Sequence, residues 1–168
     1  MFGTKKRINQ QGMYGGAGKS VSNDDRCMAR WELMQEISPE LQDLAERYTA
    51  AWCSQDPERV AGFFATGGSL TINGGQPAVG RKEISEAARS FMMAFPDLRV
   101  TMDRLAPALD RFEYHWTLTG TNTGPGGSGR AVRISGFESW RFAADGLIEE
   151  SIGSFDSNDY ARQISGTD

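Results

Sequence analysis

The spacing of apolar and polar residues changes midway along the chain. In the first half, apolar residues recur every three or four positions, which is typical of helices with one face on a core. Ser38-Pro39 and Asp56-Pro57 each place an N-cap residue before a first-turn proline, so two helices are predicted to start there. A third helix is predicted over Arg81–Phe95, where the apolar spacing continues until a proline follows.

In the second half, the apolar positions follow the two-residue period of strands. Helices first and strands after predict an α+β domain. We expect a curved antiparallel sheet with helices across its concave face, and a cavity where the helices leave the curve unfilled. The predicted strands are 69–72, 99–106, 112–122, 132–142 and 147–155, and a short helix over 157–164 is predicted to close the domain.

Two long strands flank the Gly-rich segment 124–129 and carry the most informative side chains. Side chains alternate between the two faces of a strand, so Tyr114 and Trp116 share one face and His115 lies on the other. The returning strand puts Glu138 and Trp140 on one face. Such an aromatic and polar surface is a plausible wall for a small-molecule cavity. A bulge at a strand glycine would change these faces.

The composition bounds the class of protein. A chain of 168 residues with 39% hydrophobic and 24% charged residues fits one globular domain. No run approaches the roughly 20 apolar residues of a membrane span, and no apolar block follows the basic N-terminus as in a secretory signal. With two cysteines, a disulfide framework is not expected and a cytoplasmic location is predicted.

The net charge of −4 is unevenly spread. Six Lys or Arg against two Asp give residues 1–30 a charge of +4, and the remainder carries −8. We predict a flexible basic arm over 1–26 and one domain over 27–168, opening with a short helix over 27–37. The arm does not interleave aromatic with basic residues, which argues against nucleic acid as a partner.

Four stretches in a characteristic order resemble a known family. They read QDPERVAGFFA, GRKEISEAARSFMMAFPDLRV, WTLTGTNTGPGGSGRAV, and the hairpin RFAADGLIEE ending in FD. Over roughly residues 41–164 the chain resembles the SnoaL-like polyketide cyclases of the nuclear-transport-factor-two-like superfamily. The resemblance implies an α+β cone with a deep apolar pocket, commonly a homodimer through the open sheet face. It also implies chemistry without a metal or organic cofactor, in which a carboxylate removes a proton beside a carbonyl.

The family's polar positions are kept only in part. Glu138 keeps the acidic position after the Gly-rich loop, and Asp156 matches the closing acid. Asn122 stands where the family often has His, Gly68 where it often has Asp, and Ile152 where it has a late Trp. The acid after the Gly-rich loop is therefore retained, with the closing acid, while the usual imidazole helpers are absent.

Glu138 is the strongest candidate for a general base, since a carboxylate desolvated among aromatic residues has a raised pKa. In that interpretation Asn122 and Tyr48 would stabilise the enolate. Asp156 is either a second acid or the N-cap of the last helix. The expected ligand is a small apolar or carbonyl-containing molecule. Its candidate binding residues, each of which could equally be core, are Tyr48, Trp52, Phe63, Phe91, Met92, Tyr114, Trp116 and Trp140.

The alternative is a non-catalytic module of the same fold, which binds a ligand or pairs through its sheet. A polar stripe of Glu113, His115, Thr117 and Thr119 on the outer face would suit such an interface. His115 is the single histidine of the chain, so a protein-built zinc site is not expected. The residues alone leave the enzyme and the binding module both open.

Overall fold

The computed structural model describes residues 37–166, so the predicted basic arm and nearly all of the helix predicted over 27–37 lie outside it. Helix α2 (Pro39–Cys53) begins at Ser38, whose hydroxyl accepts a hydrogen bond from the Leu41 amide at 3.2 Å. Helix α3 (Pro57–Ala61) begins at Asp56, which caps it through the amide of Glu58. Both predicted helix starts are confirmed.

The segment after α3 differs from the prediction. The short helix ends at Ala61, and strand β1 already starts at Phe64 and runs to Ile72. Phe64 is fully buried and pairs with Ile148, so its apolar ring belongs to a strand rather than to the helix predicted for it. Strand β2 (Ala78–Val79) is a two-residue addition that is not among the predicted strands. Helix α4 (Gly80–Ala94) follows at once.

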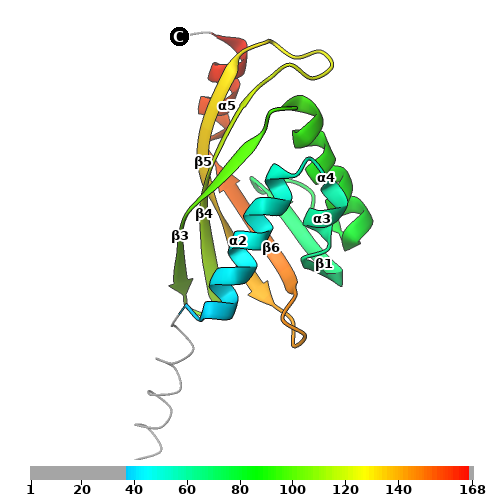
Figure 1. The fold of residues 1–168 in the computed structure, drawn as a ribbon, viewed down its shortest axis with the longest axis vertical. Coiled ribbons are helices and arrows are strands. Elements are labelled where there is room, and N and C mark those ends of the chain that lie inside the picture. The colour runs from blue at the N-terminus through cyan, green and yellow to red at the C-terminus, as the bar shows by residue number, and fades with distance from the viewer. Residues whose placement is uncertain (1–36, 167–168) are drawn as a thin grey trace, which may run out of the picture. The chain divides into compact units, whose positions relative to one another are not determined.

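Six strands form one sheet within the described residues, in the order β2-β1-β6-β5-β4-β3 (Figure 1). The remaining strands are β3 (Arg99–Ala108), β4 (Arg111–Thr121), β5 (Ala131–Phe142) and β6 (Ile148–Phe155). The sheet is curved, as predicted, but it is not wholly antiparallel. Strands β1 and β6 run parallel, and a long connection through β2, α4, β3, β4 and β5 joins them instead of a hairpin.

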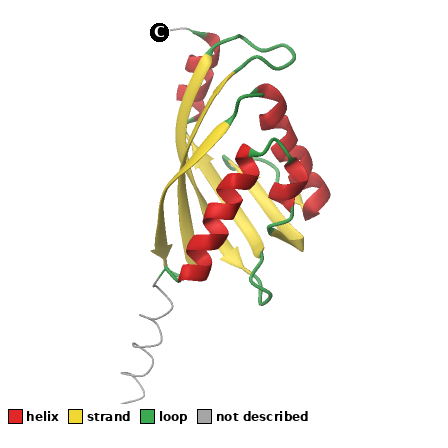
Figure 2. Ribbon diagram, in the orientation of Figure 1, coloured by secondary structure: helices red, strands yellow, loops and turns green. Residues whose placement is uncertain are grey.

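Helices α2, α3 and α4 pack against one face of the sheet (Figure 2). Their apolar faces meet the inward side chains of β1, β4, β5 and β6, as the amphipathic spacing predicts. The largest fully buried side chains of this core are Tyr48, Phe64, Ile84, Tyr114, Trp140 and Ile148.

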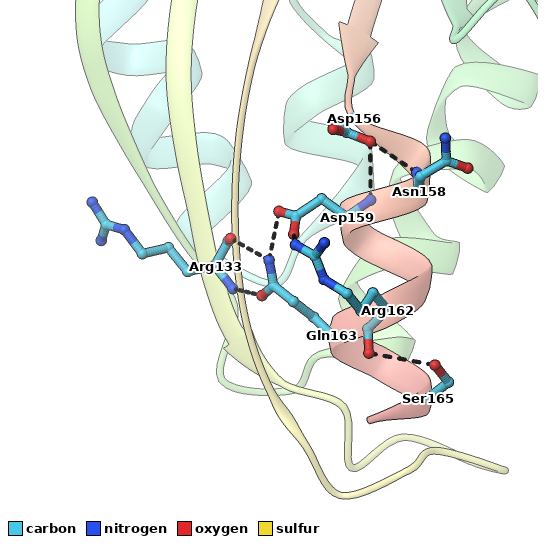
Figure 3. Close-up of polar contacts among 7 residues, drawn as sticks. All are labelled: Arg133, Asp156, Asn158, Asp159, Arg162, Gln163 and Ser165. Atoms are coloured by element: carbon cyan, nitrogen blue, oxygen red, sulfur yellow. Dashed lines mark hydrogen bonds and ion pairs between the residues drawn. The ribbon is translucent and has the colours of Figure 1, made fainter. Parts of the chain in front are cut away.

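The last helix, α5 (Ser157–Ser165), lies against β5 beyond the end of β6. Figure 3 shows the Gln163 side chain meeting the backbone of Arg133. The Gln163 carbonyl accepts from the Arg133 amide at 2.7 Å, and the Gln163 amide donates to the Arg133 carbonyl at 2.9 Å. A side chain thus satisfies backbone groups on the part of β5 that extends past its pairing with β6.

Pairing between β4 and β5 is regular from Phe112↔Trp140 to Thr121↔Ala131. The sheet's irregularities lie elsewhere, between β3 and β4 near Met102, between β5 and β6 near Arg141, and between β1 and β6 in the segment from Phe64 to Ser69. No bulge therefore forms at Gly136, and the predicted faces of the two long strands are confirmed. Within residues 37–166, no helix has the length and apolar content needed to cross a membrane.

Candidate functional site

A single carboxylate lies at the centre of the helix-covered face. Glu138 on β5 is only 6% exposed. Its Oε2 accepts three hydrogen bonds, from the hydroxyl of Tyr48 (3.0 Å), the indole N–H of Trp140 (3.0 Å) and the hydroxyl of Ser151 (2.7 Å). Its Oε1 receives only a longer contact of 3.3 Å from Tyr48. Oε1 is therefore the oxygen with unused lone pairs.

Three separate elements bring these donors together. Tyr48 comes from α2, Trp140 lies two residues along β5 on the same face, and Ser151 is the β6 partner of Trp140. Glu138 itself pairs with Tyr114 on β4 and with Gly153 on β6. The carboxylate is thus hydrogen-bonded by two residues of the sheet on one side and by one residue of helix α2 on the other.

Burial dominates the electrostatics of this carboxylate. Loss of water raises the pKa of Glu138, and the hydrogen bonds from Trp140, Ser151 and Tyr48 oppose that rise only in part. Its side-chain partners within residues 37–166 are all neutral groups, so no paired cation holds the charge. A carboxylate with a raised pKa and neutral partners has the character of a general base.

Aromatic rings fix the surroundings of Glu138. Tyr114 and Trp140 stack with centroids 4.7 Å apart and planes 11° apart, and Tyr48 meets both rings edge-on. The Tyr114 hydroxyl forms a 2.7 Å hydrogen bond with Thr49. Burial raises the pKa of Tyr48 and of Tyr114, and the nearby charge of Glu138 raises both further. Both phenols therefore remain neutral donors at physiological pH.

A cavity of about 50 Å³ lies beside Glu138. This volume holds a few water molecules, and so a fragment of only a few non-hydrogen atoms. Glu138 is the only charged residue of its lining, and nearly all the others are apolar. The lining residues are Trp52, Leu70, Ile72, Phe91, Val100, Tyr114, Trp116, Leu118, Ile134, Glu138, Gly153, Ser154 and Phe155.

The structure divides the candidate residues into three groups. Trp52, Phe91, Tyr114, Trp116 and Glu138 line the cavity. Tyr48 and Trp140 are fully buried outside the lining, and both donate to Glu138. Phe63 and Met92 belong to the apolar core and do not line the cavity.

Two candidates for the chemistry, Asn122 and Asp156, bond to the backbone, which for Asp156 is the second of its two predicted roles. The side chain of Asn122 accepts from the Ser128 amide at 2.8 Å and donates to the Ala94 carbonyl at 3.2 Å, so it fastens the Gly-rich loop to the end of α4. Asp156 accepts from the amides of Asn158 and Asp159, each at 2.9 Å, and is the N-cap of α5 (Figure 3). Neither residue lines the cavity.

Tyr48 also differs from its expected role, because its hydroxyl bonds to Glu138 rather than facing the cavity. Ser151 was not among the predicted site residues. Strand alternation over β6 puts Ser151, Gly153 and Phe155 on one face, and that pattern was the available signal. That pattern identifies Ser151 as a partner of Glu138 only if β6 is known to lie next to β5.

The outer face of the sheet carries the single histidine. His115 contacts the Glu113 carboxylate at 2.9 Å and Arg104 at 3.2 Å, away from the cavity. Within residues 37–166, no three His, Cys, Asp or Glu side chains gather in a way that could hold a metal ion.

Solved structures share this arrangement of strands and helices. A ketosteroid isomerase-like protein from Catenulispora acidiphila, in complex with trimethylamine, is 18% identical and has a TM-score of 0.65. The match covers 76% of this chain and 94% of that one. A phenazine biosynthesis-related protein from Pseudomonas aeruginosa is 18% identical with a TM-score of 0.61, covering 77% and 86%. An NTF2-like protein from Burkholderia pseudomallei is 18% identical with a TM-score of 0.63, covering 74% and 96%.

At these low identities, the structural similarity establishes only the fold, which is a nuclear-transport-factor-two-like cone. No match was found among curated proteins. The family model for SnoaL-like polyketide cyclase matches residues 42–164, which is most of the chain and includes every residue around Glu138 described above. The chain therefore belongs to the SnoaL-like polyketide cyclase family.

Proposed function

We propose that this protein binds a small carbonyl compound in the cavity beside Glu138 and removes a proton from the carbon next to the carbonyl. The observation that carries the proposal is the position of Glu138 as the only charged group on an otherwise largely apolar cavity wall. Burial raises the pKa of Glu138 and so strengthens it as a base. The trimethylamine bound by the Catenulispora acidiphila protein supports a small-molecule site in this fold.

The step balances without a co-reactant. The bond between the α-carbon and hydrogen breaks, the proton passes to Glu138, and the electron pair moves onto the carbonyl oxygen to form an enolate. In a β,γ-unsaturated ketone, the conjugated enolate takes the proton back from Glu138 at its γ-carbon, which is an isomerisation. In a molecule with a second carbonyl group, the enolate carbon attacks that carbonyl carbon and the alkoxide formed takes the proton from Glu138, which is an aldol cyclisation. Oε1 is the atom proposed to take the proton, since Oε2 already accepts three hydrogen bonds.

Exchange of α-hydrogen for deuterium tests this step without knowledge of the natural substrate. Cyclopentanone is a suitable probe because it is compact, uncharged and has exchangeable α-hydrogens. Wild-type protein in D₂O should speed exchange over the buffer rate, and Glu138→Gln should abolish the increase while binding the ketone with similar affinity. Glu149→Gln is the matched control, since Glu149 is half exposed and pairs with Arg141. Binding without faster exchange in the wild type would favour the non-catalytic ligand-binding module.

We also propose that the outer sheet face forms a homodimer interface. Ile152 on β6 is 41% exposed, and on the neighbouring strand the half-buried Phe137 shares its face. Burying these side chains in a partner would remove apolar surface from water. Ile152→Glu should halve the mass measured by light scattering. Met93→Glu, which changes an exposed apolar residue of helix α4 on the opposite side of the sheet, should leave it unchanged. A wild-type protein that is monomeric at high concentration contradicts the interface.

A further inference from the structure

Trp116 on β4 has a buried indole N–H without a hydrogen-bond partner. Among the described residues, its Nε1 is one of two buried side-chain donors in this state, and the other, on Arg111, belongs to a residue outside the cavity lining. Buried polar groups are nearly always hydrogen-bonded, and leaving one unsatisfied costs about 1–3 kcal/mol. An indole donor kept unpaired beside a cavity therefore points to a partner that is not part of the described chain.

The contrast with Trp140 sharpens this point. The Trp140 indole N–H is used internally, on Glu138 at 3.0 Å. Trp116 lies on the same sheet face and lines the cavity, where it packs against Phe155 with ring centroids 6.2 Å apart. It pairs with Gly136, whose missing side chain leaves room for the indole. The ring is thus held in place while its donor is left free.

Donor and base lie close to each other on this wall. Glu138 is two residues from Gly136, the register partner of Trp116, so Trp116 and Glu138 are diagonal neighbours on one sheet face. The Cα atoms of such neighbours are about 7–8 Å apart. Two long side chains at this separation can both contact one small molecule. A ketone oxygen and its α-hydrogen are on adjacent carbons and can therefore meet the two groups at once.

We propose that the Trp116 indole N–H donates a hydrogen bond to the carbonyl oxygen of the ligand. The ligand class is then an uncharged, mainly apolar molecule with one acceptor oxygen placed next to an acidic C–H group. When Glu138 takes the proton, the same N–H stabilises the negative charge that develops on that oxygen. The stabilisation of this negative charge rests on the proposed function. Binding through Trp116 needs no turnover and is tested separately.

The probes are cyclopentanone and methylenecyclopentane, which have nearly the same shape but differ in the acceptor oxygen. In proton–nitrogen NMR spectra, the indole resonance that Trp116→Phe removes is assigned to Trp116. Cyclopentanone should move this resonance downfield, as a new hydrogen bond does, and methylenecyclopentane should not. Trp116→Phe should weaken cyclopentanone binding about ten-fold and methylenecyclopentane binding less than two-fold.

Trp52→Phe is the control, because Trp52 lines the same cavity from α2 and loses a similar ring area. It should weaken both probes to the same extent. An unmoved Trp116 resonance at saturating ketone overturns the inference even if the variants fold poorly. An equal loss for both probes in Trp116→Phe overturns it too.

The two proposals fail in different ways. An unmoved Trp116 resonance with intact, Glu138-dependent exchange removes the role of Trp116 and keeps the function. A moved resonance without exchange removes the function and keeps the hydrogen bond as a binding contact. If neither probe binds, the cavity is not a ligand site for this class and both proposals are overturned.

Discussion

A Cβ added to Gly136 would lie 2.7 Å from Cζ2 of Trp116, its register partner on the neighbouring strand. It would also lie 2.4 Å from the backbone carbonyl of Ser154, which has little freedom to move. The missing side chain at position 136 therefore sets the place of the indole against the sheet. The glycine is part of the cavity's construction although its φ angle is not in the left-handed region.

Gly136→Ala should displace the Trp116 ring and lower stability by about 1–3 kcal/mol, the usual cost of overpacking. The loss is measured by urea unfolding, and the displacement by the indole resonance of Trp116. Gly67→Ala is the matched control, because Gly67 also lies in a strand and a Cβ there meets nothing within 4 Å. Equal stability of the two variants would contradict the tight contact.

Glu138→Gln should stabilise the fold at alkaline pH. The folded-state pKa of Glu138 lies above its unfolded value, so the folded protein holds more protons between the two values. Wild-type stability therefore falls as pH rises through this window, by about 1.4 kcal/mol per unit of pKa difference. Glutamine keeps an acceptor oxygen and carries no charge, so the variant avoids this loss.

Urea unfolding at a series of pH values measures the effect. The stability advantage of Glu138→Gln should grow as pH rises from 4 and then level off above the folded pKa. Glu149→Gln, at a half-exposed position, should show no such growth. Stability curves of wild type and Glu138→Gln that run parallel across the whole range would show that the carboxylate carries no burial penalty.

Tyr48→Phe should raise the pKa of Glu138 still further. The variant removes the hydroxyl that bonds to both carboxylate oxygens, and with it one of the contacts that lower this pKa. A carbon NMR titration of the labelled Glu138 carboxylate gives the value directly. Tyr114→Phe is the control, because its hydroxyl bonds to Thr49 instead. The expectation fails if both variants move the pKa alike.

Gln163→Ala should loosen the attachment of α5 to the sheet. The two hydrogen bonds to Arg133 are lost, and each is worth about 1 kcal/mol. Hydrogen exchange at the Arg133 amide should speed up, since water replaces the side-chain carbonyl. Asn158→Ala, at an exposed position of the same helix, should leave that exchange rate unchanged. Protection that persists in Gln163→Ala would mean that another group covers this edge.

The sequence predicts the local structure correctly where one physical signal dominates. The caps at Ser38 and Asp56 and the alternation through Tyr114, Trp116 and Glu138 depend on neighbours in the chain, and the structure follows them. The sequence alone could not separate the residues that line the cavity from those that hold Glu138 in place. Tyr48 and Trp140 are as aromatic as Trp52 and Phe91, and only the packing of α2 and α4 over the sheet decides which of them face the cavity.

Polar residues were the hardest to place for the same reason. An amide such as that of Asn122 bonds equally well to a ligand or to a loop backbone, and the geometry of segment 124–129 decides between them. Ser151 looks like any strand serine until β6 is known to pair with β5. Long-range pairing supplies the information that the local sequence lacks.

The parallel pairing of β1 with β6 has a consequence for how the chain comes together. Strand β1 is made early in synthesis, but its long partner strand is the last one to be made. Closing so distant a pair carries a large entropic cost and tends to slow folding. In a nascent chain, Leu70 and Ile72 therefore lack their β6 partners until late in synthesis. This domain completes its sheet only after synthesis has reached Phe155.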